Sequence, residues 1–565
     1  MKRLLALLLA SLMLFSLAAC GTPANEPIAT DTSEASDPQT MEMTVLETVQ
    51  IEADALRESI LNDNSEVSIV GTTYYVSQNG NDANDGLTPE TAWATVQRVT
   101  DAELKSGDGV LFERGGVFRG YGLYCQNGVT YSAYGEGEKP IITGSPENGA
   151  TADNWTLYGE TPDGGKVWLY HRNMSDCGTL VLDGKTGVRK IAPYWNGETF
   201  VTKDGETFNP LTGLTENLSF FSKADSLLPL NKASDEVFAG EWHSISLFED
   251  VYLGNEGALY FRCDDGNPGE VFDSIEFSIS PLGAGHAIFY IRSGNVIDNL
   301  HVFATSDCAF MHLDDNAEFS TLQNCEISFS GGGVLYYSQD GRAEMAGDGI
   351  NVIRPCLITN CYLHHIADNG ITVEFGDSKD VTVSDITITG NLFEYNYEDI
   401  QIVCFDTDMK ANNNIFKNIF IEKNMLLYTC GGWSSYIHSD EETGETYGAC
   451  IKCGDFDAPL NSENIVVQNN ILYAEATRSM LYGGNIGNAP PRFTNNRIII
   501  PPVASVEDKG SVIALWANDE HNGEDWNSFY WVWKDEVWPT EFSITSCDDF
   551  LNRYLGSGNT VEFIG

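Results

Sequence analysis

Short runs of alternating apolar and polar residues recur from about residue 295 onward, and an asparagine precedes each run. The recurring asparagines are Asn299, Asn324, Asn360, Asn391, Asn424, Asn470 and Asn496. Consecutive members lie 25 to 46 residues apart, which indicates one structural unit of fixed minimum length with loops of varying length. Alternation with a period of two predicts that each unit is built from strands.

Short strands at this spacing, with a turn-forming asparagine at a fixed place, predict an all-β parallel solenoid. Each coil of such a fold stacks on the next at about 4.8 Å, the distance between hydrogen-bonded strands. Asparagine side chains would then bond to the turn of the neighbouring coil and satisfy buried backbone groups. A propeller or a sandwich would need hairpin turns between paired strands, and the repeat does not contain them.

Three further segments carry a resemblance to a known group of proteins. They are YYVSQNGND at 74–82, AWAT at 92–95 and GDGVLF at 107–112. Together with the asparagine repeat, they resemble the right-handed parallel β-helix of pectate-lyase-like proteins. The resemblance covers roughly 72–140 and 285–500 and implies a first strand, a capping helix at about 90–104 and a first coil. The group contains polysaccharide lyases, glycoside hydrolases, epimerases and binding proteins, so function must come from the site.

The chain divides into further parts by composition. The asparagine phrase is absent between 146 and 285, where tryptophans and strand-like runs predict a β-rich insertion; a stack of irregular coils is the alternative. We expect the organisation to be 1–20 signal peptide, 21–70 acidic linker, 71–145 cap and first coils, 146–285 insertion, 286–500 β-helix coils and 501–565 C-terminal cap. A short helix at 41–61 or plain disorder both fit the end of the linker.

The N-terminus predicts export and lipidation. Two basic residues precede an apolar run from Leu4 to Leu17, which is too short to span a bilayer comfortably and has the form of a signal-peptide core. The following LAAC resembles a bacterial lipobox, in which Cys20 would be lipidated. An ordinary cleaved signal peptide is the alternative. The lipid on Cys20 would be the one contact with the membrane, at the bacterial cell surface.

Composition excludes some partners. The 565 residues include 82 Asp+Glu against 31 Lys+Arg, and the net charge of −51 argues against binding nucleic acid. The 42% of hydrophobic residues permit a large core. Several of the 13 cysteines lie within apolar runs, so they are interpreted as small buried hydrophobes and not as a disulfide framework. A monomer that acts on a polysaccharide is the expectation.

The strands that follow the asparagine phrases predict one polar outer face. When these strands are aligned on the preceding turn, the second and fourth residues are apolar and are expected to point inward. The residues expected to point outward are His312, Asn351, Thr372, Glu374, Gln401 and Lys452. Glu374 and Lys452 are expected in one column, two coils apart. Such a face offers the hydrogen-bonding groups that a sugar requires; simple exposed charge is the alternative for the last two.

Acidic residues recur at the corner just before these strands. They are Asp307, Asp348, Asp368 and the pair Glu398 and Asp399. Asp368 and Asp399 differ by one coil and two positions, which predicts about 8 Å between their Cα atoms. Clustered acids raise one another's pKa, as a proton donor requires, although Asp is also ordinary turn chemistry. His365 precedes the corner and is expected either to bind sugar or to be a core histidine.

Three functions fit these features. The first is glycoside hydrolysis by Asp368, Asp399, Asp348 and Glu398 in paired roles. The second is calcium-dependent β-elimination from a uronate polymer, with Lys452 or Arg354 as the base. The third is carbohydrate binding or adhesion without catalysis. The scarcity of basic residues favours hydrolysis, which needs no cofactor, while calcium stays possible, for example at Asn81–Gly86.

Overall fold

The computed structural model describes most of the chain from Thr44 to Ile564. Its description leaves out residues 1–43, 173–175, 197, 225–256, 280–286, 314–317, 338–340, 376–378, 405–408, 410–411, 438–447, 455–460, 476–477, 484–490, 501–510, 518–527, 534–535, 539–557 and 565. Cys20 and the expected signal peptide therefore lie outside the described residues. The residues from Val45 onward form one unit.

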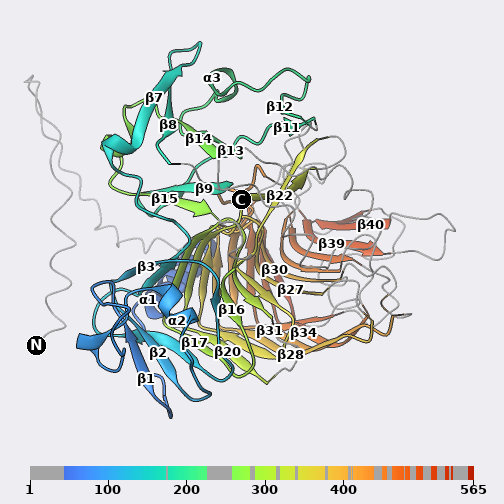
Figure 1. Ribbon diagram of the computed structural model, residues 1–565. Coiled ribbons are helices and arrows are strands. Elements are labelled where there is room, and N and C mark those ends of the chain that lie inside the picture. The colour runs from blue at the N-terminus through green and yellow to red at the C-terminus, as the bar shows by residue number, and fades with distance from the viewer. Residues whose placement is uncertain are drawn as a thin grey trace, which may run out of the picture. The chain divides into compact units, whose positions relative to one another are not determined.

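Three long sheets stack the strands coil upon coil (Figure 1). Sheet A contains β1 (Thr73–Val76), β2 (Gly109–Glu113), β5 (Thr130–Tyr134), β17 (Val296–Asp298), β20 (Ser320–Gln323), β25 (Cys356–Thr359), β28 (Thr382–Thr389), β31 (Ile415–Glu422), β34 (Ser462–Gln468) and β37 (Arg492–Thr494). Sheet B contains β3 (Val117–Arg119), β6 (Ile141–Thr143), β18 (His301–Thr305), β21 (Glu326–Ser330), β26 (Tyr362–His364), β29 (Leu392–Glu394), β32 (Met425–Thr429), β35 (Ile471–Ala474), β38 (Arg497–Ile500) and β42 (Thr560–Phe563).

Sheet C carries the face on which the candidate site lies. It contains β4 (Leu123–Tyr124), β16 (Ala287–Ile291), β19 (Cys308–His312), β24 (Ile350–Val352), β27 (Asn369–Phe375), β30 (Glu398–Cys404), β33 (Ala449–Cys453), β36 (Arg478–Gly483), β39 (Ser511–Ala517), β40 (Ser528–Trp533) and β41 (Glu536–Trp538). Strands up to β39 pair in parallel, and β40 and β41 add in antiparallel fashion. From β17 to β38 the chain visits sheets A, B and C in turn, and the predicted right-handed parallel β-helix is confirmed.

The alternating pattern places an aliphatic core between the three sheets. Ile371 of sheet C, Ile388 of sheet A and Leu363 of sheet B are all fully buried in one cluster. Each such side chain contributes about 1.5–3 kcal/mol on burial. The eleven described cysteines are all buried, as the sequence predicted.

The asparagine repeat occupies two adjacent positions of the turn from sheet A to sheet B. Asn299, Asn324 and Asn360 adopt left-handed backbone angles, with φ of 52° to 56°, which asparagine tolerates well. In later coils the asparagine comes one residue further on, and Asn391, Asn424, Asn470, Asn496 and Asn559 form a ladder. Each Oδ1 in this ladder accepts the backbone N–H of the preceding coil at 2.9–3.0 Å.

The residues between β6 and β16 form antiparallel sheets. One contains β7 (Trp155–Glu160), β8 (Lys166–Tyr170), β13 (Phe220–Ala224) and β14 (Gly257–Arg262); the others contain β9 (Cys177–Leu182), β10 (Thr186–Gly187), β15 (Ile275–Ile279), β11 (Tyr194–Trp195) and β12 (Phe200–Val201). Short helical turns accompany them: η2 (Ala152–Asn154), α3 (Pro210–Gly213) and α6 (Pro268–Val271). The described strands of this stretch therefore lie outside the three stacked sheets.

The insertion contacts a hairpin that leaves the β-helix between sheets B and C. This hairpin consists of β22 (Gly333–Tyr337) and β23 (Ala343–Ala346). Tyr337 packs in a cluster with Phe200 and Phe221 of the insertion. The backbones meet so closely that a Cβ at Gly178 would lie 2.1 Å from the Gly331 carbonyl oxygen, which leaves room for glycine alone.

Helix α1 (Val45–Leu61) covers part of sheet B. Its Val49, Ala53 and Ile60 pack against a cluster that includes Leu392 and Tyr362. Of the two alternatives for residues 41–61, the structure has the helix, so the linker expected at 21–70 contains an ordered segment. None of the described helices is long and apolar enough to cross a membrane.

The elements at the two ends of the β-helix are shorter or less fully described than the expected caps. The capping helix expected at 90–104 is reduced to the turn η1 (Pro89–Thr91) and the five-residue α2 (Val96–Thr100). Both begin at threonine caps, Thr88 and Thr95, whose side chains accept backbone N–H groups. Most of the C-terminal cap expected at 501–565 lies outside the described residues, and the described strands there extend sheets B and C.

Candidate functional site

One register column follows the outer face of sheet C across seven coils. We call it the outer column; its members are Tyr124, Tyr290, Met311, Asn351, Thr372, Gln401 and Lys452. The neighbouring column contains Ile350, Ile371, Ile400 and Ile451, which are fully buried in the core. The outer column therefore points away from the core, yet two of its members are buried: Thr372 is 0% exposed and Gln401 8%.

The register corrects one part of the sequence alignment. Lys452 pairs with Gln401, whereas Glu374 pairs with Val403. The expectation that Glu374 and Lys452 share a column is therefore wrong. The alignment placed the strand at 448–452 two residues out of register, because Ile451, and not Ala449, pairs with Ile400.

Four carboxyl groups gather on the same face, and we call them the carboxyl cluster. Its members are Asp307, Asp348, Asp368 and Glu374. Backbone bonds hold their coils in register: Asp368 N–H donates to Gly347 O at 3.3 Å, and Glu398 N–H donates to Asp368 O at 3.0 Å. Turns from sheet B to sheet C position Asp307, Asp348 and Asp368, while Glu374 lies further along β27 and accepts the Asn351 Nδ2 bond at 2.6 Å.

Burial favours the protonated forms of Asp348, Asp368 and Glu374. Burial raises the pKa of Asp348 well above its usual range, and the Asp368 and Glu374 carboxyls add to the rise. Burial also raises the pKa of Asp368 to about 6, against the opposing charge of Lys452. The pKa of Glu374 rises to about 7, mainly through burial, despite the bond from Asn351. Carboxyls in this range serve as proton donors near neutral pH.

Glu398 adds a fifth carboxyl beside this cluster. Glu398 pairs with Asn369 of the preceding coil and is 3% exposed. Lys452 Nζ lies 3.9 Å from Glu398 Oε2. The site therefore combines acids of raised pKa with one carboxylate next to a cation.

Asp399 lies away from this face, contrary to the sequence expectation. It is 0% exposed. Its Oδ1 accepts the Asn396 Nδ2 bond at 3.0 Å, and its Oδ2 accepts the Thr429 hydroxyl. The equivalent position one coil earlier is Gly370, where a Cβ would meet the core side chain of Phe393. Asp399 thus points into the corner of the β-helix, and the predicted catalytic pair of Asp368 and Asp399 does not form.

Replacing Asp399 by asparagine tests this placement through stability. Burial raises the pKa of Asp399 from 3.8 to about 7, so the folded state binds this proton more tightly than the unfolded chain. The stabilising contribution is therefore full below pH 3.8 and is lost as the pH rises to about 7. Asp399→Asn should raise the free energy of unfolding at about pH 8 by about 2 kcal/mol and leave it unchanged near pH 4.

Urea unfolding at both pH values measures this effect. Asparagine keeps the bond from Asn396 and donates to Thr429, so the variant should fold. If the free energy of unfolding of Asp399→Asn depends on pH as that of the wild type does, the placement of Asp399 is contradicted. It is also contradicted if the wild-type protein degrades a glycan and Asp399→Asn does not.

His365 lies at the corner of sheet B and not in the carboxyl cluster. Its ring stacks between Phe329 and Tyr395, with centroids 4.8 and 5.3 Å away, and Trp433 donates to its backbone carbonyl at 2.9 Å. Burial, reinforced by His364, lowers the pKa of His365 to about 3, which keeps the ring neutral. The residue therefore belongs to a stack of aromatic side chains.

Two buried oxygen atoms on the sheet C face have no hydrogen-bond partner. They are Asn369 Oδ1 and Thr372 Oγ1, on residues that are 3% and 0% exposed. Asn369 Nδ2 donates to Asp348 Oδ1 at 3.0 Å, which leaves Oδ1 to another donor. Buried polar atoms are normally paired, so this pair indicates a place for a ligand. Sequence reasoning missed Asn369, although it follows Asp368 directly.

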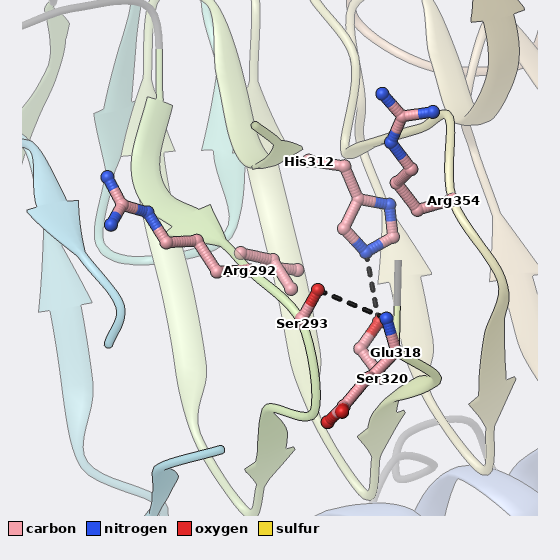
Figure 2. A pocket seen from close by; sticks show the side chains of 7 residues that line it. Arg292, Ser293, His312, Glu318, Ser320 and Arg354 are labelled. Carbon is pink, nitrogen blue, oxygen red and sulfur yellow. Dashed lines mark hydrogen bonds between the residues drawn. The ribbon is translucent and has the colours of Figure 1, made fainter. Parts of the chain in front are cut away.

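A separate pocket lies where strands of sheet C lead into sheet A (Figure 2). It is lined by Ile291, Arg292, Ser293, His312, Glu318, Ser320 and Arg354. His312 Nε2 bonds to Ser320 Oγ at 3.0 Å. Burial, together with Arg354, lowers the pKa of His312 to about 4. The expected sugar-facing His312 therefore lines this pocket and is not in the outer column.

The calcium site considered at Asn81–Gly86 is a network of turn bonds. Asp82 accepts the backbone N–H groups of Ala94 and Thr95 at 2.8 and 3.0 Å. Asp85 accepts the Leu87 N–H and the Thr91 hydroxyl. Among the described residues, no group of three or more His, Cys, Asp or Glu side chains is arranged to hold a metal ion.

The sheets define a right-handed parallel β-helix protein. No protein-family model matches the chain. A stretch of 97 residues is 36% identical to a lacto-N-biosidase of Bifidobacterium longum, and this match spans 15% of the chain and 6% of that protein's length.

Solved structures with similar architecture include several carbohydrate-related proteins. The complex of XylC with xylose gives a TM-score of 0.39 at 10% identity, over 82% of this chain and 90% of that one. Lacto-N-biosidase from Eubacterium ramulus gives 0.31 at 12% identity, over 76% and 64%. An exopolygalacturonase from Thermotoga maritima gives 0.34 at 12% identity, over 82% and 90%. Scores at this level do not assign a reaction.

Proposed function

We propose that this chain is a glycoside hydrolase that degrades a polysaccharide outside the cell. The observation that carries the proposal is the carboxyl cluster, in which acids of raised pKa share one face with two buried oxygens that have no hydrogen-bond partner. Glycosidic bonds are broken by carboxyl pairs in which one member is protonated and the other is charged.

Asp368 is the general acid in this proposal. Its side chain is half-buried, and its pKa of about 6 keeps a proton available under mildly acidic conditions. The proton passes to the glycosidic oxygen as the bond from that oxygen to the anomeric carbon breaks. Glu398, next to Lys452, either takes a proton from the attacking water or attacks the anomeric carbon itself. Asn351, Thr372 and Gln401 of the outer column hold the sugar hydroxyls.

Elimination from a uronate polymer is the second candidate. Lys452 favours it, because an amine in the outer column is placed as a base near Asp368 and Glu398. Binding without turnover is the remaining alternative.

A panel of plant and host glycans separates the three functions. Hydrolysis releases reducing ends without ultraviolet absorbance from unsaturated products, whereas elimination releases reducing ends with that absorbance. Binding of a glycan without release of either product would support adhesion. Release of unsaturated products would overturn the hydrolase proposal.

We also propose that the protein is lipid-anchored at the bacterial surface through Cys20. The support is the sequence LAAC after a signal-peptide core. Cells that express the full chain should incorporate an alkyne-tagged palmitate into it, and Cys20→Ser should abolish the label and release the protein from the membrane fraction. Equal labelling of the Cys20→Ser variant would refute the anchor.

A further inference from the structure

Two buried cysteines lie one above the other in neighbouring coils of the β-helix. Cys325 and Cys361 each take the second position of the turn from sheet A to sheet B. The strands on both sides of this turn are in register, since β20 pairs with β25 and β21 pairs with β26. The Tyr362 N–H donates to the Cys325 carbonyl oxygen at 2.8 Å. The two cysteines are therefore separated by one coil, about 4.8 Å between their Cα atoms.

The side chains of this pair also have matching orientations. Cys325 Sγ lies 3.2 Å from the carbonyl oxygen of Gln323, and Cys361 Sγ lies 3.4 Å from that of Thr359. Both residues are thiols that are 0% exposed, and the two thiols interact with each other. Disulfides join residues whose Cα atoms are about 4.4–6.8 Å apart. Rotation about the two Cα–Cβ bonds can thus join the sulfur atoms while the backbone keeps its register.

Burial alone does not set this pair apart, because all the described cysteines are buried. Cys356, for example, lies between Ser320 and Ile386 in the register of sheet A, so the paired residues of the two neighbouring coils offer it no second sulfur. The stacking of Cys325 on Cys361 is therefore the observation that points to a bond.

We infer that Cys325 and Cys361 are joined by a disulfide when the chain folds under oxidising conditions, and that this bond joins the two coils between which the β22–β23 hairpin leaves the β-helix. Each thiol loses its hydrogen, one S–S bond forms, and the two electrons reduce an external disulfide, such as oxidised glutathione, to two thiols. Burial raises the pKa of the Cys325 thiol well above its usual range. The reactive thiolate is therefore available before the coils pack, and the bond forms during folding.

The disulfide encloses part of the candidate site without taking part in its chemistry. The enclosed residues, 326–360, include the hairpin, Asp348 and Asn351. A cross-link restricts the unfolded chain and thereby stabilises the folded one. The oxidised protein should melt about 3–6 °C above the reduced protein. Equal melting temperatures of the two forms would overturn the inference that the bond holds these coils together. The inference goes beyond the proposed function, and its test needs no glycan.

Refolding in a glutathione buffer tests the bond directly. The full chain is unfolded in urea with a reductant, refolded with oxidised and reduced glutathione, blocked with N-ethylmaleimide and digested with chymotrypsin without reductant. Most of the chain should yield the peptide of Cys325 linked to that of Cys361, and a reductant should release both peptides. Alkylation of both thiols, or linkage of either one to a different cysteine, would overturn the inference.

Cys361→Ser and Cys356→Ser are the matched variants for this experiment. Both replace one sulfur by oxygen in a fully buried residue. Cys361→Ser removes the proposed bond, so it should melt at the same temperature in oxidising and in reducing buffer. Cys356→Ser should keep the linked peptide and the difference in melting temperature, and loss of both would overturn the assignment.

A chain that does not refold in vitro is tested in its folded form. Cells that export the full chain into an oxidising compartment supply this form, which is alkylated and digested in the same way. The linked peptide should again be present, and two alkylated thiols would again overturn the inference.

Discussion

Asp368→Asn should reduce glycan hydrolysis by about 10²–10⁴-fold, the usual contribution of a general acid. Asparagine has the shape of the protonated side chain but no proton to give to the leaving oxygen. In the wild type, activity should decline as the pH rises above about 6, because Asp368 then loses its proton. The residual activity of the variant should lack this decline. Initial rates on the best glycan of the panel, measured across pH, test both expectations.

Asp385→Asn is the control for this substitution. Asp385 lies on sheet A, where it bonds to Ser384 and Asn418 at the surface. Asparagine tolerates its left-handed φ of 59°, so this variant should hydrolyse the glycan at the wild-type rate. Full activity of Asp368→Asn, with an unchanged circular dichroism spectrum, would remove Asp368 from the mechanism.

Lys190→Met should destabilise the insertion by about 3–5 kcal/mol, because it leaves a buried carboxylate without its cation. Lys190 Nζ bonds to both oxygens of Asp176 at 2.8 and 2.6 Å and to Gly332 O at 3.3 Å. Asp176 also accepts the Val334 N–H at 2.8 Å. The pair thereby joins the insertion to the hairpin that precedes Asp348. Urea unfolding followed by tryptophan fluorescence measures the loss.

Two further variants give this prediction its controls. Lys417→Met breaks an ion pair with Glu463 whose side chains are 40% and 59% exposed, so it should cost less than about 1 kcal/mol. Adding Asp176→Leu to Lys190→Met should recover part of the stability, since the unpaired charge is then gone. Equal unfolding curves for Lys190→Met and the wild type would show that the Lys190–Asp176 pair does not stabilise the folded protein.

The regular part of the fold was predictable because one corner of every coil is constant. Two residues join sheet A to sheet B in seven successive coils, from 299–300 to 495–496. The first residue of this turn has a left-handed backbone conformation. In later coils the second residue is an asparagine that bonds to the preceding coil, so the sequence repeats at this turn. Asparagine occupies the first turn position at Asn360 and the second at Asn391. The spacing of asparagines along the sequence could not predict this shift, because both positions favour asparagine.

The candidate site was less predictable because the alternation fails at the corner between sheets B and C. Asp399 and Ile400 are adjacent, yet both point inward. The equivalent positions 349 and 370 are glycines, which have no side chain, so the sequence gives no sign that the period of two fails there. Burial of the face also depends on segments distant in sequence. The raised pKa values and the unpartnered oxygens therefore could not be predicted from the sequence, whereas the row of acids at this corner could.

Three long connections leave the β-helix at that same corner. The insertion, the β22–β23 hairpin and residues 430–448 each join a strand of sheet B to a strand of sheet C. They also meet one another, because Trp433 lies against Gly187 and Gly332. One coil with a short connection separates the insertion from the hairpin, and two such coils separate the hairpin from residues 430–448. These three segments can therefore change in length and sequence while the stack beneath keeps its register.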